Sequence, residues 1–501
     1  PMMLAFFHVL LVLALAVLTL STPVPAPGPA CGGGTPVVNQ SGPIPDCPGK
    51  LQVHNASCDP RVVWEKRALF HAGSECHGEN DLNGLFEYRG VYHVFFQDHV
   101  TATTGGHLAT TDFVHWKRLP IAIWNDHWYD KAAIWTFSAT IVNDVPHIIY
   151  PGIAGPNASL GDCGHGPTGA GCFTHAMATP ANLSDPWLVD WVKPDCNPII
   201  GNISIRNRDP TTAWQTALGE WRYMDAVANM YSSWDFRSWM KVGALPSFGT
   251  GDCPDFFPVP RVCDGCSRLS QSPRLQHALS PPPSQPTHVR EGGFQAVYAL
   301  GMYTDGAANT TGNWTAVVDG VPMDLGGPQN IYAAKTMEDS KGRRIWWAWI
   351  KLESTFLEYF DENNVPYPGF KSGGCHGIGN LMTNTNSMPR EVSFDPTLMS
   401  LVYFPLVELR ALRGRVLGTI DRPTLVRAGN DLVVTNTGAA QSETRVTFAM
   451  PTACTTIGLR LLTGTGGNQG LLRGSQGMSV PFSLTHTLKL CLSLSVSLSV
   501  S

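Results

Sequence analysis

An internal repeat constrains the fold of this chain more than any other feature of its sequence. Asp112–Trp116 (DFVHW) returns as Asp235–Trp239 (DFRSW), and a looser copy, Asp185–Trp191, lies between them. Each copy adjoins short runs of alternating apolar and polar residues, which are typical of β-strands. The copies begin 73 and 50 residues apart. An Asp…Trp signature that recurs at such intervals indicates the blades of a β-propeller.

The composition supports a structure made of strands and turns. Of the 501 residues, 43% are hydrophobic, 10% are aromatic and only 15% are charged, and the chain contains 50 Gly and 39 Pro. Long helices depend on Ala, Leu, Glu and Lys, whereas turns and short strands use Gly, Pro and aromatic residues. We therefore predict an all-β protein. The net charge of −5 and the lack of a basic run argue against nucleic acid as a partner.

The N-terminal residues predict entry into the secretory pathway. Residues 3–20 form an apolar run interrupted only by His8, and a Pro/Ala/Gly-rich stretch follows as far as Ala30. We predict a signal peptide over residues 1–30, or a retained signal anchor that would be the chain's one contact with a membrane. The expected location is extracellular or vacuolar. Seven N-x-Ser/Thr glycosylation sequons agree with this route: Asn39, Asn55, Asn157, Asn182, Asn202, Asn309 and Asn313.

The cysteine content fits the same compartment. Thirteen cysteines in an exported chain predict several disulfides and a leftover thiol. The pair Cys263-x-x-Cys266 has no second half, so a loop disulfide or mere proximity is the better interpretation than a zinc site.

The chain divides by composition into an arm, a large strand-rich region and a smaller one. Residues 31–62 form a Cys/Pro/Gly-rich arm, and residues 63–402 carry most of the short strand patterns. Within this region the Ser/Pro/Gln-rich residues 267–290 predict an inserted loop. Residues 403–482 predict a second, smaller β unit. Residues 483–501 decay into a low-complexity tail of Ser, Leu and Val.

Three Asp residues lie at predicted turns next to strand patterns. Asp81 belongs to the stretch Glu79–Leu85, whose Asn, Asp and Gly residues predict a turn before the strand run Val91–Gln97. Asp209 directly precedes a Pro, and Asp252 precedes one by two positions. Such carboxylates would converge if the blades are arranged around a channel, and two carboxylates that face one sugar bond perform glycoside hydrolysis. For each residue alone, the alternative is a solvated turn Asp or a structural Arg–Asp pair.

Eight motifs follow one another over roughly residues 68–413. In order, they are Asn80–Gly84, Phe95–Gln97, Gly106–Trp116, Phe137–Thr140, Arg208–Thr211, Asp252–Phe257, Tyr332–Thr336 and Ser387–Glu391. Together they resemble those of glycoside hydrolase family 32, the family of invertases, β-fructofuranosidases and fructan hydrolases. The resemblance implies a five-bladed β-propeller followed by a β-sandwich. The C-terminal unit has about half the length of such a sandwich, so we expect a partial one.

The resemblance assigns a catalytic role to each of the three Asp residues. It makes Asp81 the nucleophile that attacks the anomeric carbon of a fructofuranosyl unit. Asp209, oriented by Arg208, would hold fructose hydroxyls and stabilise an oxocarbenium-like transition state. Asp252 would be the general acid/base. This chemistry needs one ionised carboxylate for the covalent intermediate and one protonated carboxyl group to release the leaving group.

The resemblance also implies substrate contacts and an activity. Asn80, Gln97 and Ser138 would bond the fructose ring, and Trp135 would pack near the mouth of the pocket. The implied activity is retaining hydrolysis of terminal β-D-fructofuranosyl residues of sucrose or fructans by a monomer that needs no metal or cofactor. The alternatives are a fructosyltransferase, or a catalytically weakened fructan-binding homologue.

Three positions depart from the family's pattern. Asp252 replaces Glu and is one methylene shorter, so the acid sits up to ~1.5 Å further back. Misplacing a general acid can cost a factor of ~10²–10⁴ in rate, and Asp255 is the next candidate if Asp252 does not serve. Leu82 replaces the usual Pro after the nucleophile. Gly105 replaces a Trp, which predicts a thinner wall of the substrate pocket.

Overall fold

The computed structural model describes the strand-rich part of the chain. The predicted N-terminal segments 1–30 and 31–62 lie outside it, as do Cys263 and Cys266. In the part that is described, no helix is long and apolar enough to cross a membrane. The described residues are 72, 79–99, 103–154, 173–259, 275–280, 296–323, 331–351, 384–396, 398–420, 422, 424–425, 441–449, 455–461, 478–484 and 491–499.

The described residues form an all-β structure, as the composition predicts. Its larger sheets follow one another along the chain and consist mainly of antiparallel strands. The first holds β1 (Glu79–Tyr88), β2 (Val91–His99), β3 (Thr103–Thr110) and β4 (Trp116–Ile123); the second holds β5 (Ala133–Ile134), β6 (Ser138–Val142), β7 (Val145–Ile153), β8 (Phe173–Pro180), β9 (Trp191–Val192) and β10 (Ile200–Ile203); the third holds β11 (Trp214–Gln215), β12 (Trp221–Met224), β13 (Asn229–Ser233) and β14 (Met240–Ala244).

Two further sheets of this kind come next in the chain, and short 3-10 helices, η1 (Pro246–Phe248) and η2 (Val407–Leu412), precede and follow them. The fourth sheet holds β15 (Asp255–Pro258), β16 (Leu275–Ser280), β17 (Val297–Thr304) and β18 (Asn313–Pro322); the fifth holds β19 (Ile331–Glu338), β20 (Arg344–Lys351), β21 (Asn384–Asn386), β22 (Arg390–Asp395) and β23 (Ser400–Pro405).

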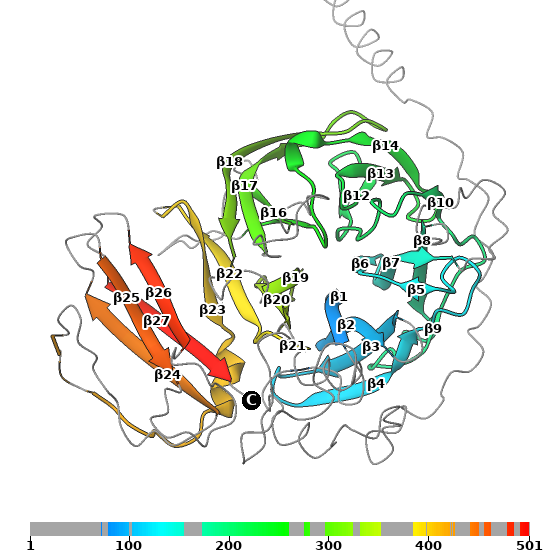
Figure 1. The fold of residues 1–501 in the computed structure, drawn as a ribbon. Helices are drawn as coiled ribbons and strands as arrows, with labels where there is room; N and C mark the ends of the chain where they lie inside the picture. Colours follow the sequence, from blue (N-terminus) through cyan, green and yellow to red (C-terminus); the bar gives the residue numbers. More distant parts are fainter. Residues whose placement is uncertain are drawn as a thin grey trace, which may run out of the picture.

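The large sheets have a propeller-like arrangement around a common centre (Figure 1). The first and last of them meet, because Leu82 and Leu85 of β1 share a buried cluster with Ile345 and Trp347 of β20. The ring is thus closed by apolar packing between strands more than 250 residues apart in the sequence. Burying these faces against one another is the main stabilising contribution available to such sheets.

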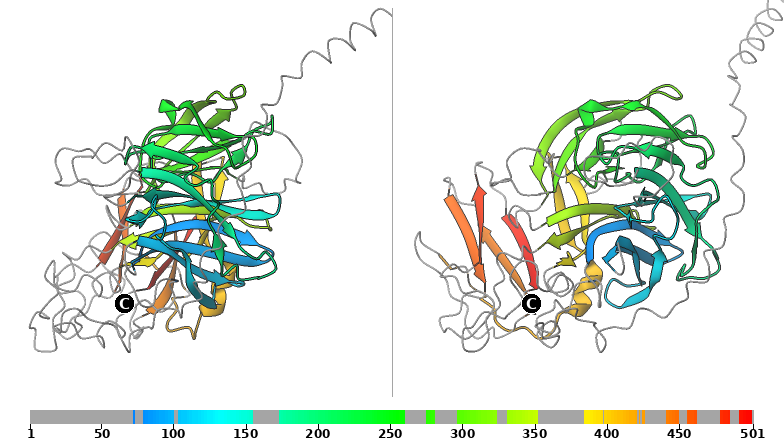
Figure 2. Two further views of the ribbon diagram at one scale, coloured as in Figure 1. Left: turned by 90° about the vertical axis from the view of Figure 1, so that its right-hand side faces the viewer. Right: turned by 45° about the vertical axis from the view of Figure 1, so that its right-hand side comes forward.

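Two small sheets follow the ring and lie outside it (Figures 1 and 2). β24 (Gln441–Ala449) pairs with β27 (Cys491–Ser499), and β25 (Thr455–Leu461) pairs with β26 (Met478–Leu484). The Ser/Leu/Val residues 483–501, predicted as a tail outside the second β unit, therefore contain strand β27, which pairs with β24 of that unit.

The Asp…Trp repeat forms the same type of turn in three sheets. The carboxylates of Asp112, Asp185 and Asp235 each accept two hydrogen bonds, 2.7–3.0 Å long, from backbone N–H groups two to four residues ahead. Three residues before each Trp, a buried side chain is held on a backbone with positive φ: Phe113 (60°), Leu188 (45°) and Phe236 (60°). The turns connect β3 to β4, β8 to β9, and β13 to β14.

The prediction of a turn at Glu79–Leu85 was wrong, because these residues belong to strand β1. The register of β1 against β2 shifts between Glu79 and Leu82 and again between Asn83 and Phe86. Gly84 lies at the second shift with φ of +45°. The Asn, Asp and Gly residues of Glu79–Leu85 therefore do not reverse the chain. They allow irregularities within strand β1 that change the direction of its side chains.

The prediction of an inserted loop over residues 267–290 was also wrong for the residues in the middle of this range. Leu275–Ser280 form β16, which pairs with both β15 and β17. The Ser- and Pro-rich residues on both sides dominate the composition and conceal a strand of only six residues.

Two buried histidines lie in contact in the first sheet. His93 Nδ1 lies 3.0 Å from His107 Nε2, and both side chains are inaccessible. Burial lowers the pKa of His93 from its usual 6.5 to about 3 and lowers that of His107 as well. Because the folded pKa lies below the unfolded one, the fold favours the neutral ring. The stability contributed by the neutral His93 ring is fully present above pH 6.5 and is lost as the pH falls towards 3.

We therefore expect the unfolding free energy to fall by about 2 kcal/mol between pH 7 and pH 5 through His93 alone. Denaturant unfolding at several pH values measures this slope, and His93→Gln should flatten it. A His93→Gln variant with the same pH slope as the wild type would contradict the assignment.

Candidate active site

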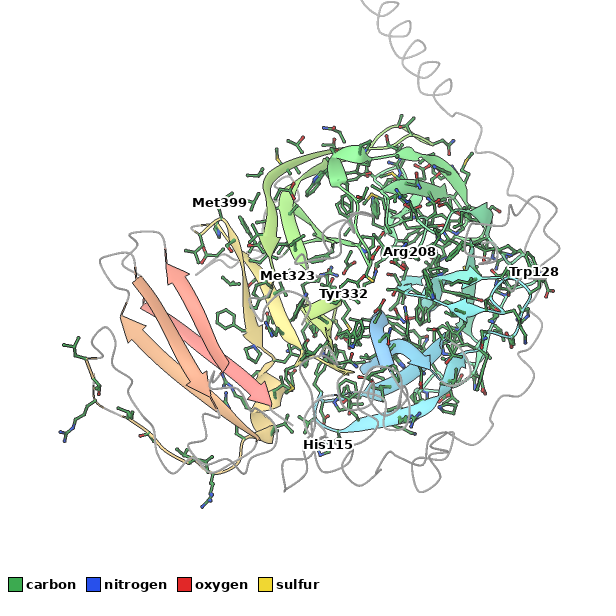
Figure 3. The ribbon with its side chains drawn as sticks, in the orientation of Figure 1. His115, Trp128, Arg208, Met323, Tyr332 and Met399 are labelled. Carbon is green, nitrogen blue, oxygen red and sulfur yellow. The ribbon has the colours of Figure 1, made fainter. Side chains whose placement is uncertain are left out.

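The structure brings the three predicted carboxylates together. Asp81 lies on β1, Asp209 lies between β10 and β11, and Asp252 lies just before β15. Cys253 links the first two: its backbone N–H donates to Asp209 Oδ2 (3.0 Å), and its Sγ lies 3.4 Å from Asp81 Oδ2. Arg208 links the other two, since its guanidinium contacts Asp252 and lies 3.4 Å from Asp209 Oδ2. Figure 3 shows Arg208 near the middle of the ring, whereas Trp128 lies at its periphery.

Asp81 is a buried carboxylate that accepts hydrogen bonds from three side chains. Thr136 Oγ1 donates at 2.6 Å, Gln97 Nε2 at 3.2 Å and the Cys253 thiol at 3.4 Å. Burial raises the pKa of Asp81, while the bonds from Thr136 and Cys253 act in the opposite direction. Burial also raises the pKa of the Cys253 thiol, so it stays protonated and donates. The carboxylate is therefore held in one orientation.

Asp209 sits on a strained backbone. Its φ is +57°, a conformation that costs a non-glycine residue of order 1–3 kcal/mol and is concentrated at functional sites. Burial raises the pKa of Asp209 to about 7, against the opposing influence of Arg208 and the Cys253 N–H. A carboxyl group with this pKa exchanges its proton in the neutral range.

Asp252 is the most accessible of the three carboxylates, with 20% of its side chain exposed. Arg208 contacts Oδ1, and the Tyr332 hydroxyl donates to Oδ2 at 2.9 Å. Burial raises the pKa of the Tyr332 phenol, so Tyr332 keeps its proton and acts as a donor. The most exposed of the three carboxyl groups is thus fixed through both of its oxygens.

The predicted substrate-binding residues differ in how they contact the three carboxylates and their neighbours. Gln97 is directly on Asp81, and Asn80 precedes Asp81 on β1 and is half-buried. Trp135 is half-buried, with its ring 5.7 Å from the Arg208 guanidinium. Ser138 is committed to the protein: its hydroxyl donates to the Pro210 carbonyl (2.7 Å) and accepts from a lysine.

Four site residues were missed by the sequence reasoning: Thr136, Cys253, Tyr332 and Lys335. Lys335 is buried, and its Nζ bonds Ser138 Oγ (3.1 Å) and the Pro254 carbonyl (2.7 Å). All four lie inside, or directly next to, motifs quoted above. Their types gave no signal, because their function depends on distances across sheets instead of spacing along the chain.

Gly105, where the resemblance predicts a thinner pocket wall, lies in strand β3 against two buried side chains. It is buried, and a Cβ added there would lie 3.1 Å from Ile123 and 3.4 Å from the Phe137 ring. The space beside this glycine is already filled by these two side chains.

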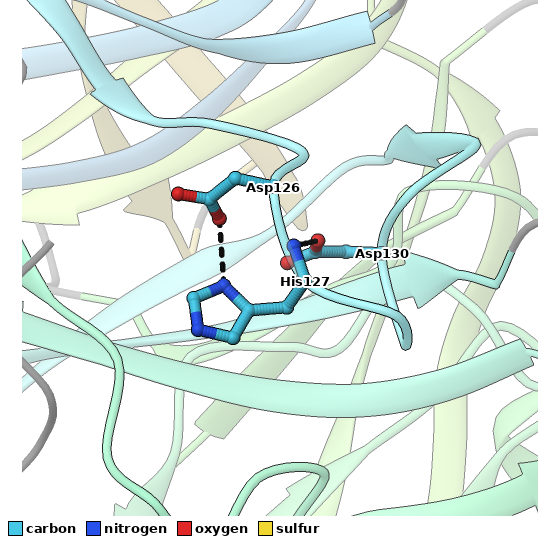
Figure 4. A group of neighbouring side chains, drawn as sticks. All are labelled: Asp126, His127 and Asp130. Carbon is cyan, nitrogen blue, oxygen red and sulfur yellow. Dashed lines mark hydrogen bonds and ion pairs between the residues drawn. The ribbon is translucent and has the colours of Figure 1, made fainter. Parts of the chain in front are cut away.

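One acidic cluster in the described residues has the spacing of a metal site, but a lysine supplies its positive charge. Asp126, His127 and Asp130 form this cluster (Figure 4). Lys193 Nζ lies 2.6 Å from a carboxylate oxygen of both Asp126 and Asp130. The donor set is therefore explained by a buried ion pair that holds the connection between β4 and β5.

Comparison with known proteins agrees with this geometry. Over 382 residues the chain is 31% identical to an acid beta-fructofuranosidase of Vigna radiata, covering 71% of this chain and 52% of that protein. Over 423 residues it is 30% identical to beta-fructofuranosidase, insoluble isoenzyme 3, of Oryza sativa subsp. indica, covering 78% and 65% respectively. The chain thus spans about half to two thirds of the length of these relatives.

Solved structures share the fold. Sucrose-6-phosphate hydrolase from Lactobacillus gasseri superposes with a TM-score of 0.57 at 17% identity, covering 88% of each chain. Fructan 1-exohydrolase IIa from Cichorium intybus, in complex with 1-kestose, gives 0.56 at 24% identity, covering 77% of this chain and 68% of that one. The family model described as Glycosyl hydrolases family 32 N-terminal domain matches residues 71–367. Because this match covers more than half of the chain, the protein belongs to glycosyl hydrolase family 32.

Proposed function

We propose that the chain is a retaining glycoside hydrolase that releases terminal β-D-fructofuranosyl residues from sucrose or fructans. The observation that carries the proposal is the convergence of Asp81, Asp209 and Asp252 through Cys253 and Arg208. The names of the relatives, which are acid and insoluble beta-fructofuranosidases, support the substrate class. So does the 1-kestose bound to the structural neighbour from Cichorium intybus.

The geometry suggests a division of roles. Asp81, held by Thr136 and Gln97, attacks the anomeric carbon and forms the covalent fructosyl-enzyme intermediate. Asp252, at the entrance, gives its proton to the leaving oxygen and then takes one from the attacking water. Asp209 accepts hydrogen bonds from fructose hydroxyls as positive charge develops on the ring.

In this proposal, Arg208 and Trp135 lie at the mouth of the sugar-binding pocket. Asn80 and Gln97 would contact the fructose ring. Ser138 acts from behind, since its hydroxyl is already shared between the Pro210 carbonyl and Lys335. We therefore propose that Ser138 holds the Pro210 carbonyl and Lys335 in position and does not bind the sugar directly.

The same proposal covers the architecture and the location. Each large sheet corresponds to one blade of a five-bladed catalytic propeller over about residues 63–402, followed by a partial β-sandwich. The vacuolar and insoluble isoenzymes among the relatives support export through a cleaved signal peptide, with glycosylation on the way. Three of the sequons, at Asn182, Asn309 and Asn313, are exposed.

A fructan-binding protein of low activity is the second candidate, and Asp252 favours it. The shorter side chain is held by Arg208 and Tyr332, so it does not extend freely towards a leaving group. A fructosyltransferase is the third, in which a sugar instead of water resolves the intermediate.

Incubation of the purified full chain with sucrose and with inulin separates these functions. Hydrolysis of sucrose releases glucose and fructose in equal amounts. A transferase releases more glucose than fructose, and a binding protein releases neither but binds fructan in calorimetry. Absence of both release and binding would contradict the proposal.

A further inference from the structure

We propose that Phe137 is a positioning residue that fastens residues 135–138 to strand β1, so that Thr136 stays on the Asp81 carboxylate. The inference rests on the proposed function, because it assigns Asp81 the role of nucleophile. Phe137 is fully buried, so it would act only through its neighbours.

The backbone of Phe137 is bonded to β1 on both sides. Its N–H donates to Asn83 Oδ1 at 3.2 Å, and its carbonyl accepts from the Gly84 N–H at 2.9 Å. Both partners lie two or three residues after Asp81 on the same strand. The connection between β5 and β6 is thus attached to the strand that carries the proposed nucleophile.

The ring of Phe137 completes the attachment. A Cβ added to Gly84 would lie 2.7 Å from the ring, and one added to Gly105 would lie 3.4 Å from it. The ring therefore occupies space that two glycines of the first sheet leave open, and it meets Phe95 edge-on at 5.8 Å. Close packing of this kind tolerates little change in volume without movement of its surroundings.

The residues on either side of Phe137 carry the chemistry. Thr136 Oγ1 donates the shortest hydrogen bond to Asp81, at 2.6 Å, and Ser138 bonds the Pro210 carbonyl. The bond from Thr136 lowers the pKa of Asp81 against the effect of burial. Loss of the ring should therefore let Thr136 move away and raise the pH at which the nucleophile ionises.

The test compares Phe137→Ala, Thr136→Val and the double variant by pH profiles of kcat/KM on sucrose and by thermal unfolding. We expect Phe137→Ala to lower kcat about 10- to 100-fold, the value of one hydrogen bond to a charged group. The acidic limb of the profile should move up by about one pH unit. Thr136→Val should do the same, and the double variant should add little. Phe137→Leu is the milder variant to use if the Ala variant does not fold.

Phe236→Ala is the matched control, because Phe236 is equally buried but lies in the turn between β13 and β14. It should lower the unfolding temperature and leave the pH profile in place. The inference is overturned if Phe137→Ala behaves in the same way. If the wild-type chain releases no sugar, the proposed function fails, but thermal unfolding still tests the inference. Additive losses of stability from Phe137→Ala and Thr136→Val would overturn it, and a coupled loss in the double variant would support it.

Discussion

Asp81→Ala should reduce sucrose turnover by at least about 10³-fold while the protein remains folded. Removing the group that forms the covalent intermediate leaves the substrate contacts but no route through that intermediate. The fold should survive because burial disfavours the ionised carboxylate, as its raised pKa indicates. Of the three donors left behind, Gln97 already donates to the Thr136 hydroxyl at 2.9 Å, and the Cys253 thiol lies 3.6 Å from the same oxygen.

Release of glucose and thermal unfolding of the same sample measure both parts of this prediction. Asp235→Ala is the matched control, since it removes a carboxylate that accepts backbone N–H groups in the turn between β13 and β14 and makes no contact with the three site carboxylates in the hydrogen bonds described above. It should lower the unfolding temperature and leave kcat unchanged. An Asp81→Ala enzyme with more than a few per cent of wild-type activity would remove Asp81 from the nucleophile's role.

The repeat and the composition predicted the fold class, because both depend on local chemistry. An Asp that accepts backbone N–H groups gives the same turn wherever it occurs, so Asp112 and Asp235 could be matched from the sequence alone. Local chemistry misled at Glu79–Leu85, where the residues of a turn occupy an irregular strand. Packing between sheets decides whether such residues form a turn or an irregular strand, and a local sequence pattern carries no information about that packing.

The site was predictable in its charges but not in its supports. Asp81, Asp209 and Asp252 stand out because each carboxylate lies within three residues of a Gly or a Pro, next to a strand pattern. Thr136 lies between β5 and β6 and Tyr332 lies on β19, and their contacts with Asp81 and Asp252 join residues 55 and 80 positions apart. Only the closure of the ring brings such pairs within hydrogen-bonding distance.

Asp252→Asn should suppress hydrolysis of sucrose by about 10²–10⁴-fold and that of activated aryl fructosides far less. A sugar leaves as an alkoxide unless its oxygen is protonated, whereas an activated phenolate leaves without help. The amide of Asn retains the size of the side chain and its contacts with Arg208 and Tyr332 in part, so the change chiefly removes the transferable proton. Steady-state kinetics on the two substrate types give the ratio that matters.

Asp252→Glu tests the same assignment in the opposite direction. The extra methylene restores the reach of the acid, so sucrose turnover should rise, or stay level if the backbone already presents Asp252 to the leaving oxygen. Asp255→Asn is the control within the same motif. Its carboxylate is buried and accepts from the Thr336 N–H (2.8 Å) and hydroxyl (2.7 Å), so this variant should lose stability without any dependence on the leaving group. If Asp252→Asn slows both substrate types equally and only slightly, Asp252 is not the acid, and a dependence of Asp255→Asn on the leaving group would then transfer that role to Asp255.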